Sequence, residues 1–341
     1  VYLVEIRGEA SKQAEETAAR TILAVKPASV THLTLDTSGG ERAELARDGT
    51  RWLLAAPVQY PADTEAVDRA LRVLEKLEST ETIEPKPADL APFGLGETRK
   101  SVEVRSTEIN TLFLGGNTPI GGGRYVALEN EPKRLFTVLA GALTGLTPTL
   151  LELRDKRLLR MGEGGANELI VRSGGTLVAH AQRVGAAWNL IEPEAAPGDV
   201  ERIKRVVDDL ALARASAFED TPQPLEKYGL ASPLFEVTVS GAGFQEQLAF
   251  GRADGRTYVQ RLGDPVILEA NERVIASVPV KLFDYRAKRV LTLDAEAVRG
   301  LELAFPRENR SQRLKREGQV WKADEPGIEL KPVEVEDALY A

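Results

Sequence analysis

Apolar and polar positions alternate where the first regular segment of the chain begins. The apolar residues at 30–35 are spaced as in a strand with one buried face. Two further strand-like runs, 41–47 and 51–55, flank Asp48-Gly49. An Asp-Gly pair between such runs predicts a tight hairpin, in which both turn residues adopt positive φ. The same pattern predicts a hairpin turn at Asp254-Gly255.

A long amphipathic helix is predicted next. Asp63 can cap it by accepting a backbone N–H, and the apolar residues that follow recur at helical spacing. These residues are Val67, Ala70, Leu71, Leu74 and Leu77, and a second stripe of the same kind is Ile203, Val206, Val207 and Leu210.

The segment after this helix predicts a proline-rich link, several short strands and a short helix. The strands are expected at 101–105, 111–114, 124–128 and 135–138, and the short helix near 140–145. Because the strands cluster without alternating with helices, the fold class is expected to be α+β. Each unit would be a mostly antiparallel sheet with one long amphipathic helix and one short helix.

This pattern occurs more than once, and the three tryptophans show the repeat. Each has a glycine three residues before it and a proline five residues after it. The first two copies share an offset of 188 − 52 = 136 residues. The sequence therefore predicts repeat unit one at 22–157, repeat unit two at 158–289 and an incomplete third unit at 290–341, preceded by a stalk at 1–21. The third unit carries Pro332 where the others have the capping aspartate.

The recurring positions form a structural repeat framework. Because repeated features usually report the fold, the tryptophans are expected on the core side of the sheet rather than as a stacking platform for a ligand. The framework positions are Gly49, Trp52, Pro57, Asp63, Gly94, Gly115, Tyr125, Gly185, Trp188, Pro193, Asp199, Gly229, Gly251, Tyr258, Gly318, Trp321 and Pro326.

Composition excludes some classes of function. The net charge of −8 argues against a nucleic-acid partner. The basic run at 310–316 is read as a solvated strand or turn face. The chain has no cysteine, so neither disulfides nor a cysteine-based zinc site are possible.

The glycine-rich run at 115–123 is the motif that most resembles a ligand site. Gly116 and Gly121 have the spacing of a phosphate-binding loop, but Gly122-Gly123 stands where Lys-Ser/Thr belongs. A hairpin loop is therefore favoured. Because this run is shorter in the second copy, it is a candidate interaction loop. Its residues are Gly116, Asn117, Gly121, Gly122 and Gly123.

No catalytic, cofactor or metal constellation is recognised in the sequence. His32 and His180 stand outside the repeated framework, and nothing in the sequence brings them together as a metal pair. No nucleophile-elbow pattern supports a Ser-His-Asp triad. The expectation is a protein that is not an enzyme.

The first four residues, Val-Tyr-Leu-Val, are open to two interpretations. They suit the last turn of a membrane helix with an interfacial tyrosine, followed by a polar juxtamembrane stalk. They suit an ordinary first strand equally well.

The framework also resembles a bacterial family known only as a domain of unknown function, number four-three-four-zero. The resemblance covers nearly the whole chain after about residue 20. It implies an N-terminal membrane helix, an extracytoplasmic location in the periplasm or at the cell surface, and pairing with permease and ATPase subunits of ABC-type or gliding-type transporters. It brings no catalytic residues. It is carried by Trp52, Pro57, Pro61, Asp63, Pro92 to Leu95, Leu114-Gly115, Tyr125-Val126 and Arg154 to Leu159.

Three functional hypotheses follow. The first is a membrane-anchored accessory subunit of an ABC-type transporter that acts by protein–protein contact. The second is a cell-envelope module that binds a glycan or a peptide. The third, ranked below both, is a hydrolase whose residues the sequence does not reveal.

Overall fold

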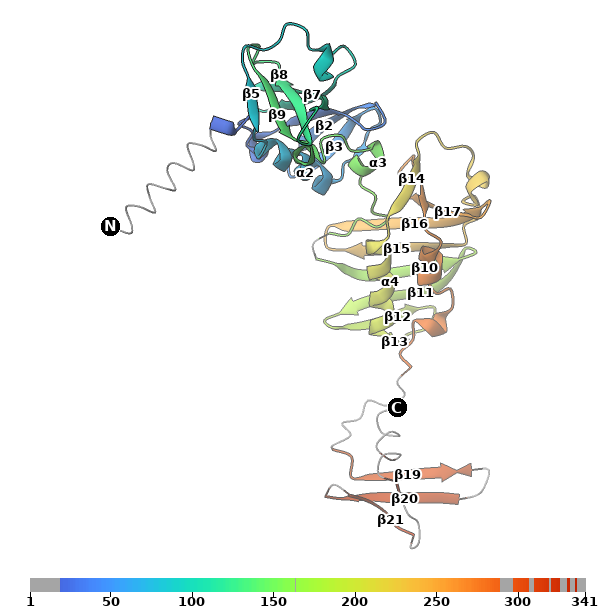
Figure 1. Cartoon of the computed structure of the whole chain (residues 1–341). Helices are drawn as coiled ribbons and strands as arrows, with labels where there is room; N and C mark the ends of the chain where they lie inside the picture. Colours follow the sequence, from blue (N-terminus) through green and yellow to red (C-terminus); the bar gives the residue numbers. More distant parts are fainter. Residues whose placement is uncertain are drawn as a thin grey trace, which may run out of the picture. The chain divides into compact units, whose positions relative to one another are not determined.

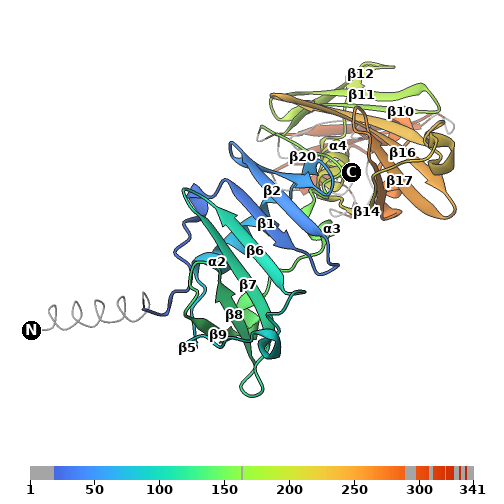
Figure 2. The same ribbon diagram turned by 90° about the horizontal axis from the view of Figure 1, so that it is seen from above.

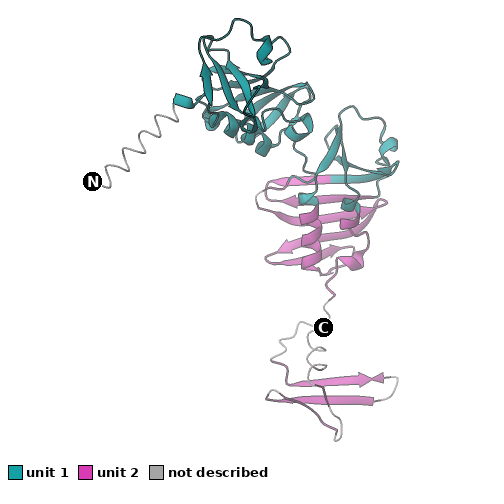
Figure 3. Ribbon diagram, viewed as in Figure 1, with its two compact units in different colours: residues 1–160, 210–234, 248–275 teal, residues 161–209, 235–247, 276–341 magenta. Residues whose placement is uncertain are grey.

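The computed structural model describes residues 19–162, 164–288, 297–306, 310–318, 320–325, 330, 331 and 335. Most of the expected stalk at 1–21 lies outside the described residues, as do Pro326 and Pro332. Contacts divide the chain into two compact units, one with residues 1–160, 210–234 and 248–275, the other with 161–209, 235–247 and 276–341 (Figure 3). This division differs from the repeat boundaries, which stay a prediction.

The first sheet has nine strands in the order β4-β3-β2-β1-β6-β7-β8-β9-β5, and Figure 2 shows β2, β1, β6, β7, β8 and β9 following one another across it. All its neighbouring strands are antiparallel. The strands are β1 (His32–Asp36), β2 (Arg42–Asp48), β3 (Arg51–Ala56), β4 (Tyr60–Pro61), β5 (Glu81–Ile83), β6 (Lys100–Arg105), β7 (Ile109–Asn117), β8 (Gly123–Leu128) and β9 (Leu135–Leu139).

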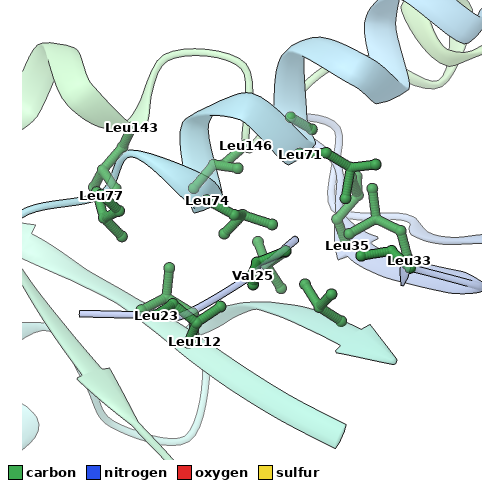
Figure 4. Close-up of a cluster of buried hydrophobic side chains, with 14 of the residues drawn as sticks. Leu23, Val25, Leu33, Leu35, Leu71, Leu74, Leu77, Leu112, Leu143 and Leu146 are labelled. Atoms are coloured by element: carbon green, nitrogen blue, oxygen red, sulfur yellow. The ribbon is translucent and has the colours of Figure 1, made fainter. Parts of the chain in front are cut away.

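Helix α2 (Thr64–Glu75) packs its apolar stripe against this sheet. Asp63 caps it as predicted, accepting a hydrogen bond from the Ala66 amide at 2.9 Å. Figure 4 shows Leu71 and Leu74 facing Leu33 and Leu35 in the core. The shorter helices are η1 (Pro27–Ser29), η2 (Ala91–Phe93), η3 (Ala140–Leu143) and α3 (Leu150–Leu153), so the short helix expected near 140–145 is a 3-10 helix.

The second sheet repeats the first, strand for strand, in the order β13-β12-β11-β10-β15-β16-β17-β18-β14. Helix α4 (Val200–Leu212) takes the place of α2 (Figure 1). The predicted fold class, an α+β tandem repeat of mostly antiparallel sheets, is therefore confirmed. The strands are β10 (Ala166–Ser173), β11 (Thr176–Val184), β12 (Ala187–Glu192), β13 (Ala196–Pro197), β14 (Ala215–Glu219), β15 (Phe235–Gly241), β16 (Phe244–Ala253), β17 (Arg256–Arg261) and β18 (Ile267–Ala270), and the remaining helices are η4 (Leu225–Tyr228), α5 (Arg273–Ser277) and η5 (Leu282–Asp284).

The described part of the third unit is a three-stranded sheet of β19 (Gly300–Phe305), β20 (Arg310–Glu317) and β21 (Val320–Ala323). Leu314, Trp321 and Val335 form its small core. The basic run lies on β20, where Arg313 pairs with Glu302 and Lys315 pairs with Asp324. These contacts agree with the interpretation of a solvated strand face.

The tryptophans lie in the cores, as expected, with Trp52 1%, Trp188 5% and Trp321 5% exposed. The turn before Trp52 differs from the prediction. Asp48 pairs with Arg51 in the ladder, so the turn residues are Gly49 and Thr50, and of these Gly49 has positive φ. The predicted turn at Asp48-Gly49 is therefore wrong by one residue.

The turn at Asp254-Gly255 does have positive φ at both positions, 49° and 75°. Ala253 and Arg256 pair on either side of it. This turn forms as the sequence predicts.

The glycines at Gly94 and Gly115, which recur as Gly229 and Gly251 in the second copy, have a steric cause. A Cβ on Gly94 would lie 2.4 Å from the Gly116 amide nitrogen, and a Cβ on Gly115 would lie 2.6 Å from the Phe93 carbonyl oxygen. In the second copy a Cβ on Gly251 would likewise lie 2.3 Å from the Tyr228 carbonyl oxygen. The link between β5 and β6 therefore crosses β7 at backbone contact, which only glycine permits.

None of the helices among the described residues combines the length and the apolar character that crossing a bilayer requires.

Candidate functional site

A cavity of about 450 Å³ opens beside strand β5 in the first repeat unit. Four elements form it: the edge strand β5, the strands β9 and β8, and the loop that joins β7 to β8. We call it the β5 cavity. Its lining residues are Thr80, Glu81, Ile83, Thr118, Pro119, Ile120, Gly121, Gly123, Tyr125, Thr137 and Leu139.

The candidate interaction loop provides one wall of this cavity. The residues that form the loop in the structure differ from those predicted. Gly116 and Asn117 belong to β7, and Gly123 begins β8 and is buried. The loop itself is 118–122, with Gly121 and Gly122 exposed and at positive φ. The interaction role of these residues stays a prediction.

Hydrogen bonds hold the loop in one shape. The Thr118 hydroxyl donates to the Ile120 carbonyl at 2.8 Å and accepts from the Gly123 amide at 3.0 Å. The Ala140 amide donates to the Gly122 carbonyl at 3.1 Å, which ties the loop tip to the end of β9. The loop is thus a formed wall rather than an open connection.

The cavity is mostly apolar, and two of its side chains are strongly exposed. Ile120 is 88% and Leu139 is 60% exposed. Ile83 and Tyr125 are half-buried and pack on the small cluster of Leu95, Ala127 and Leu135 on this face of the sheet. When a partner removes apolar surface of this kind from water, the free energy of the system falls, so binding is favoured.

The second copy has charged residues at the equivalent place. Tyr125 pairs with Thr137, whereas the equivalent Tyr258 pairs with Glu269. Arg256, at the position of Gly123, lies 3.3 Å from the Glu269 carboxylate. Asn271 stands where the first copy has Leu139. The apolar lining of the β5 cavity is therefore replaced by charged and polar residues at the equivalent place in the second copy.

The sequence did not reveal strand β5. Its three residues lie where the prolines at 85 and 87 indicated a link, and the only signal is the run of β-prone residues Thr80, Thr82 and Ile83. Because β5 comes last in the sheet order, its outer edge pairs with no other strand of the described chain.

The equivalent edge in the second copy, β14, is covered by residues of the first. Arg154 donates to both carboxylate oxygens of Asp220, at 2.9 and 2.7 Å. Its guanidinium carbon lies 3.8 Å from the ring centroid of Phe218 and 4.4 Å from that of Tyr60. All four residues belong to the first compact unit. We call them the Arg154 cluster.

Asp155 forms a second polar group next to this cluster. It is 5% exposed and accepts hydrogen bonds from Arg157 and Arg160. Burial alone would raise the pKa of the Asp155 carboxyl, but the hydrogen bonds and positive charge of Arg157 outweigh it and lower that pKa. Asp155 is therefore held as a buried carboxylate.

A smaller, polar cavity of about 280 Å³ lies at the start of α2. Two of its basic side chains have partners, since Arg157 binds Asp155 and Arg214 donates to the carbonyls of Ala211 and Ala213, and Lys156 is the third basic residue that lines it. Asp63 and Glu65 also line it. This mixed lining gives no preference for one charge of ligand.

The histidines take part in local contacts. His32 hydrogen-bonds the Thr31 hydroxyl, and His180 hydrogen-bonds Glu168 at 2.8 Å. The hydrogen bond from His180 lowers the pKa of the Glu168 carboxyl. Among the described residues, no group of three or more histidine and acidic side chains is placed to hold a metal ion.

Comparison with known families matches the chain to one family, described as a domain of unknown function (DUF4340), over residues 52–186 and 188–341. The two matched segments start at the equivalent residues Trp52 and Trp188. No curated protein and no solved structure matches the chain. The chain belongs to the DUF4340 family and carries two tandem copies of its domain, which confirms the resemblance read from the framework residues.

Proposed function

We propose that this two-copy member of the family is an extracytoplasmic accessory subunit of an ABC-type transporter, anchored by a membrane helix before Val1. It would act by protein–protein contact within the complex that the permease and ATPase subunits form. The transporter, the anchor and the location rest on what the sequence resemblance implies. The contact surface rests on the structure.

The observation that carries the proposal is the difference between the two edge strands. In the second copy, the surface of β14 receives Arg154 and Tyr60 from another part of the chain. In the first copy, Thr82 and Glu84 occupy the equivalent positions on β5 and its end, and both are exposed. A surface that contacts another part of the chain in one copy is thus exposed in the other, on the same edge strand whose opposite face lines the apolar β5 cavity.

The alternative of glycan binding loses its most obvious platform. Trp52 and Trp188 are buried, so they offer no ring face on which a sugar could stack. An apolar cavity beside a strand edge suits a polypeptide better, because a strand edge offers main-chain hydrogen bonds to another strand.

Crosslinking in native membranes tests the proposal. The tagged full-length protein with its own N-terminus would be crosslinked in its host, purified, and its partners identified by mass spectrometry. We expect permease and ATPase subunits. The double variant Ile120→Ser/Leu139→Asn should reduce their recovery, whereas Ile109→Ser, which removes another exposed apolar side chain (56% exposed) from the same sheet, should not.

Recovery of the protein alone from well-solubilised membranes would refute the transporter assignment. Equal recovery of the subunits with both variants would retain the transporter assignment but would show that the contact does not lie at the β5 cavity.

A further inference from the structure

We infer that the β5 edge and the β5 cavity bind an extended segment of a partner protein in which a branched apolar residue stands next to a basic residue. This inference rests on the proposed function only in taking the partner to be a protein. It adds the chemistry by which the partner is recognised.

The apolar residue follows from the cavity. Ile83, Tyr125, Ile120 and Leu139 surround it, and the charged residue that lines it is Glu81, at the exposed rim. A branched side chain entering here would cover Ile120 and Leu139, whose exposure otherwise keeps apolar surface in water. In the second copy, the Arg256–Glu269 ion pair stands at the equivalent place instead of apolar side chains.

The basic residue follows from the interface already present in the chain. Asp220 stands just after β14 and receives the guanidinium of Arg154. Strand register places Glu84 at the same position after β5, since Glu81 and Ala217 occupy equivalent places opposite β9 and β18. The first copy therefore keeps the carboxylate that binds arginine in the second copy.

Among the described residues, Glu84 has Arg134 as its ion-pair partner, and this partner can be exchanged. Arg134 lies 3.5 Å from its carboxylate, with the two side chains 49% and 53% exposed. Exposed pairs of this kind contribute little to stability and are screened by salt. An incoming arginine on an ordered strand could replace Arg134 at small cost, because Arg134 also lies 3.9 Å from Glu131.

The extended form follows from pairing already seen beside this edge. Thr21 forms an antiparallel bridge with Glu78, with hydrogen bonds from Ile22 to Leu77 and from Ser79 to Arg20. The second copy repeats this contact between Arg157 and Arg214. One extended segment of the chain thus already pairs with the residues that immediately precede β5. Strand β5 continues the same edge.

Alternation along a strand then fixes the spacing in the partner. Glu81 and Ile83 line the cavity, so Thr82 and Glu84 face the other side of the sheet. A strand that adds to β5 presents neighbouring residues to opposite sides. The sequence numbers of the apolar residue for the cavity and of the basic residue for Glu84 must therefore differ by an odd number. Adjacent residues, which differ by one, fit best.

A synthetic peptide tests this chemistry on the full chain. The probe is a fluorescein-labelled decapeptide of alternating serine and threonine with Leu-Arg at its centre, titrated by fluorescence anisotropy. We expect a dissociation constant of about 1 mM or tighter, as suits one anchored side chain and a short strand. Replacing the leucine with alanine, or separating leucine and arginine by one residue, should weaken binding about tenfold.

Matched protein variants make the test specific. Ile120→Ser/Leu139→Asn should weaken binding of the Leu-Arg peptide about tenfold, and Ile109→Ser should leave it unchanged. Glu84→Arg should weaken the Leu-Arg peptide but restore binding of a Leu-Glu peptide. Circular dichroism spectra equal to that of the unchanged protein establish that each variant is folded.

The inference is overturned if the Leu-Arg peptide fails to bind at millimolar concentration, or if it binds all variants equally. It is also overturned if Ile120→Ser/Leu139→Asn abolishes self-association of the chain, because the occupant would then be a second copy. Peptide binding without recovery of transporter subunits would retain the site and refute the transporter. Recovery of those subunits without peptide binding would retain the transporter assignment and refute the peptide site.

Discussion

Arg154 holds Asp220 with both terminal nitrogens of its guanidinium group, across 66 positions of sequence. Arg154 side-chain atoms are 3% exposed, whereas those of Asp220 are 32% exposed. The equivalent arginine of the second copy, Arg286, reaches Glu194 at 3.2 Å, with the two side chains 42% and 55% exposed. One framework position thus forms a buried two-point contact in one copy and a surface ion pair in the other.

Asp220→Ala should lower the free energy of unfolding by about 2–3 kcal/mol, because it leaves the buried Arg154 without its carboxylate. The partial exposure of Asp220 keeps the loss below that of a fully buried pair. Urea denaturation followed by tryptophan fluorescence measures the change.

Glu194→Ala provides the control, since it removes the carboxylate from the exposed arginine Arg286 and should cost less than about 1 kcal/mol. Equal losses in the two variants would contradict the buried role of the Arg154 cluster.

Because of Asp155, the stability of the protein should depend on pH in the acid range. Its pKa is lowered in the folded state from an unfolded value of 3.8, so its contribution is fully present above that pH and is lost as the pH falls through the folded pKa. Asp155→Asn should therefore be less stable than the unchanged protein at neutral pH, with a difference that shrinks below about pH 3.8.

Urea midpoints measured from pH 7 to pH 2.5 test this dependence. Comparison of the two proteins isolates Asp155 from Glu152 and Glu168, whose pKa values are also lowered by hydrogen bonds. A stability difference that stays constant across this range would contradict the assignment.

The sequence predicted the elements whose signal is local. The stripe of Val67, Leu71 and Leu74 and the cap at Asp63 specified α2, because period and capping need only nearby residues. The repeat added confirmation, since the same signals recur in α4. The tryptophans could be placed in the core for the same reason.

The features that the sequence did not predict depend on distant residues. Strand β5 has three residues and is held by pairing with β9, more than 50 positions away. The cavity forms only where β5, β9 and the 118–122 loop come together, so the sequence of any one segment does not predict it. The loop drew attention because it is rich in glycine and because its length differs between copies. The glycines at 115 and 116 proved to be strand residues that the link crosses.

Gly115→Ala should destabilise the first repeat unit by about 1–3 kcal/mol. The new methyl group would lie 2.6 Å from the Phe93 carbonyl oxygen and 2.8 Å from the Tyr125 carbonyl oxygen, so backbone on two sides would have to move. Gly141→Ala is the matched control, because no atom lies within 4 Å of its added Cβ. Thermal unfolding by circular dichroism distinguishes them, and equal melting temperatures would exclude the close approach.

The two capping aspartates offer a comparison within one molecule. Asp63 accepts from the Ala66 amide at 2.9 Å, and Asp199 accepts from the Arg202 amide at 3.0 Å. Each satisfies an amide at the start of a helix that has no partner within the helix. Asp63→Ala and Asp199→Ala should each cost about 1 kcal/mol. Hydrogen–deuterium exchange should speed up in the first turn of α2 for one variant and of α4 for the other. Faster exchange in both helices from a single variant would show that the two copies do not open independently, and would contradict a local capping role.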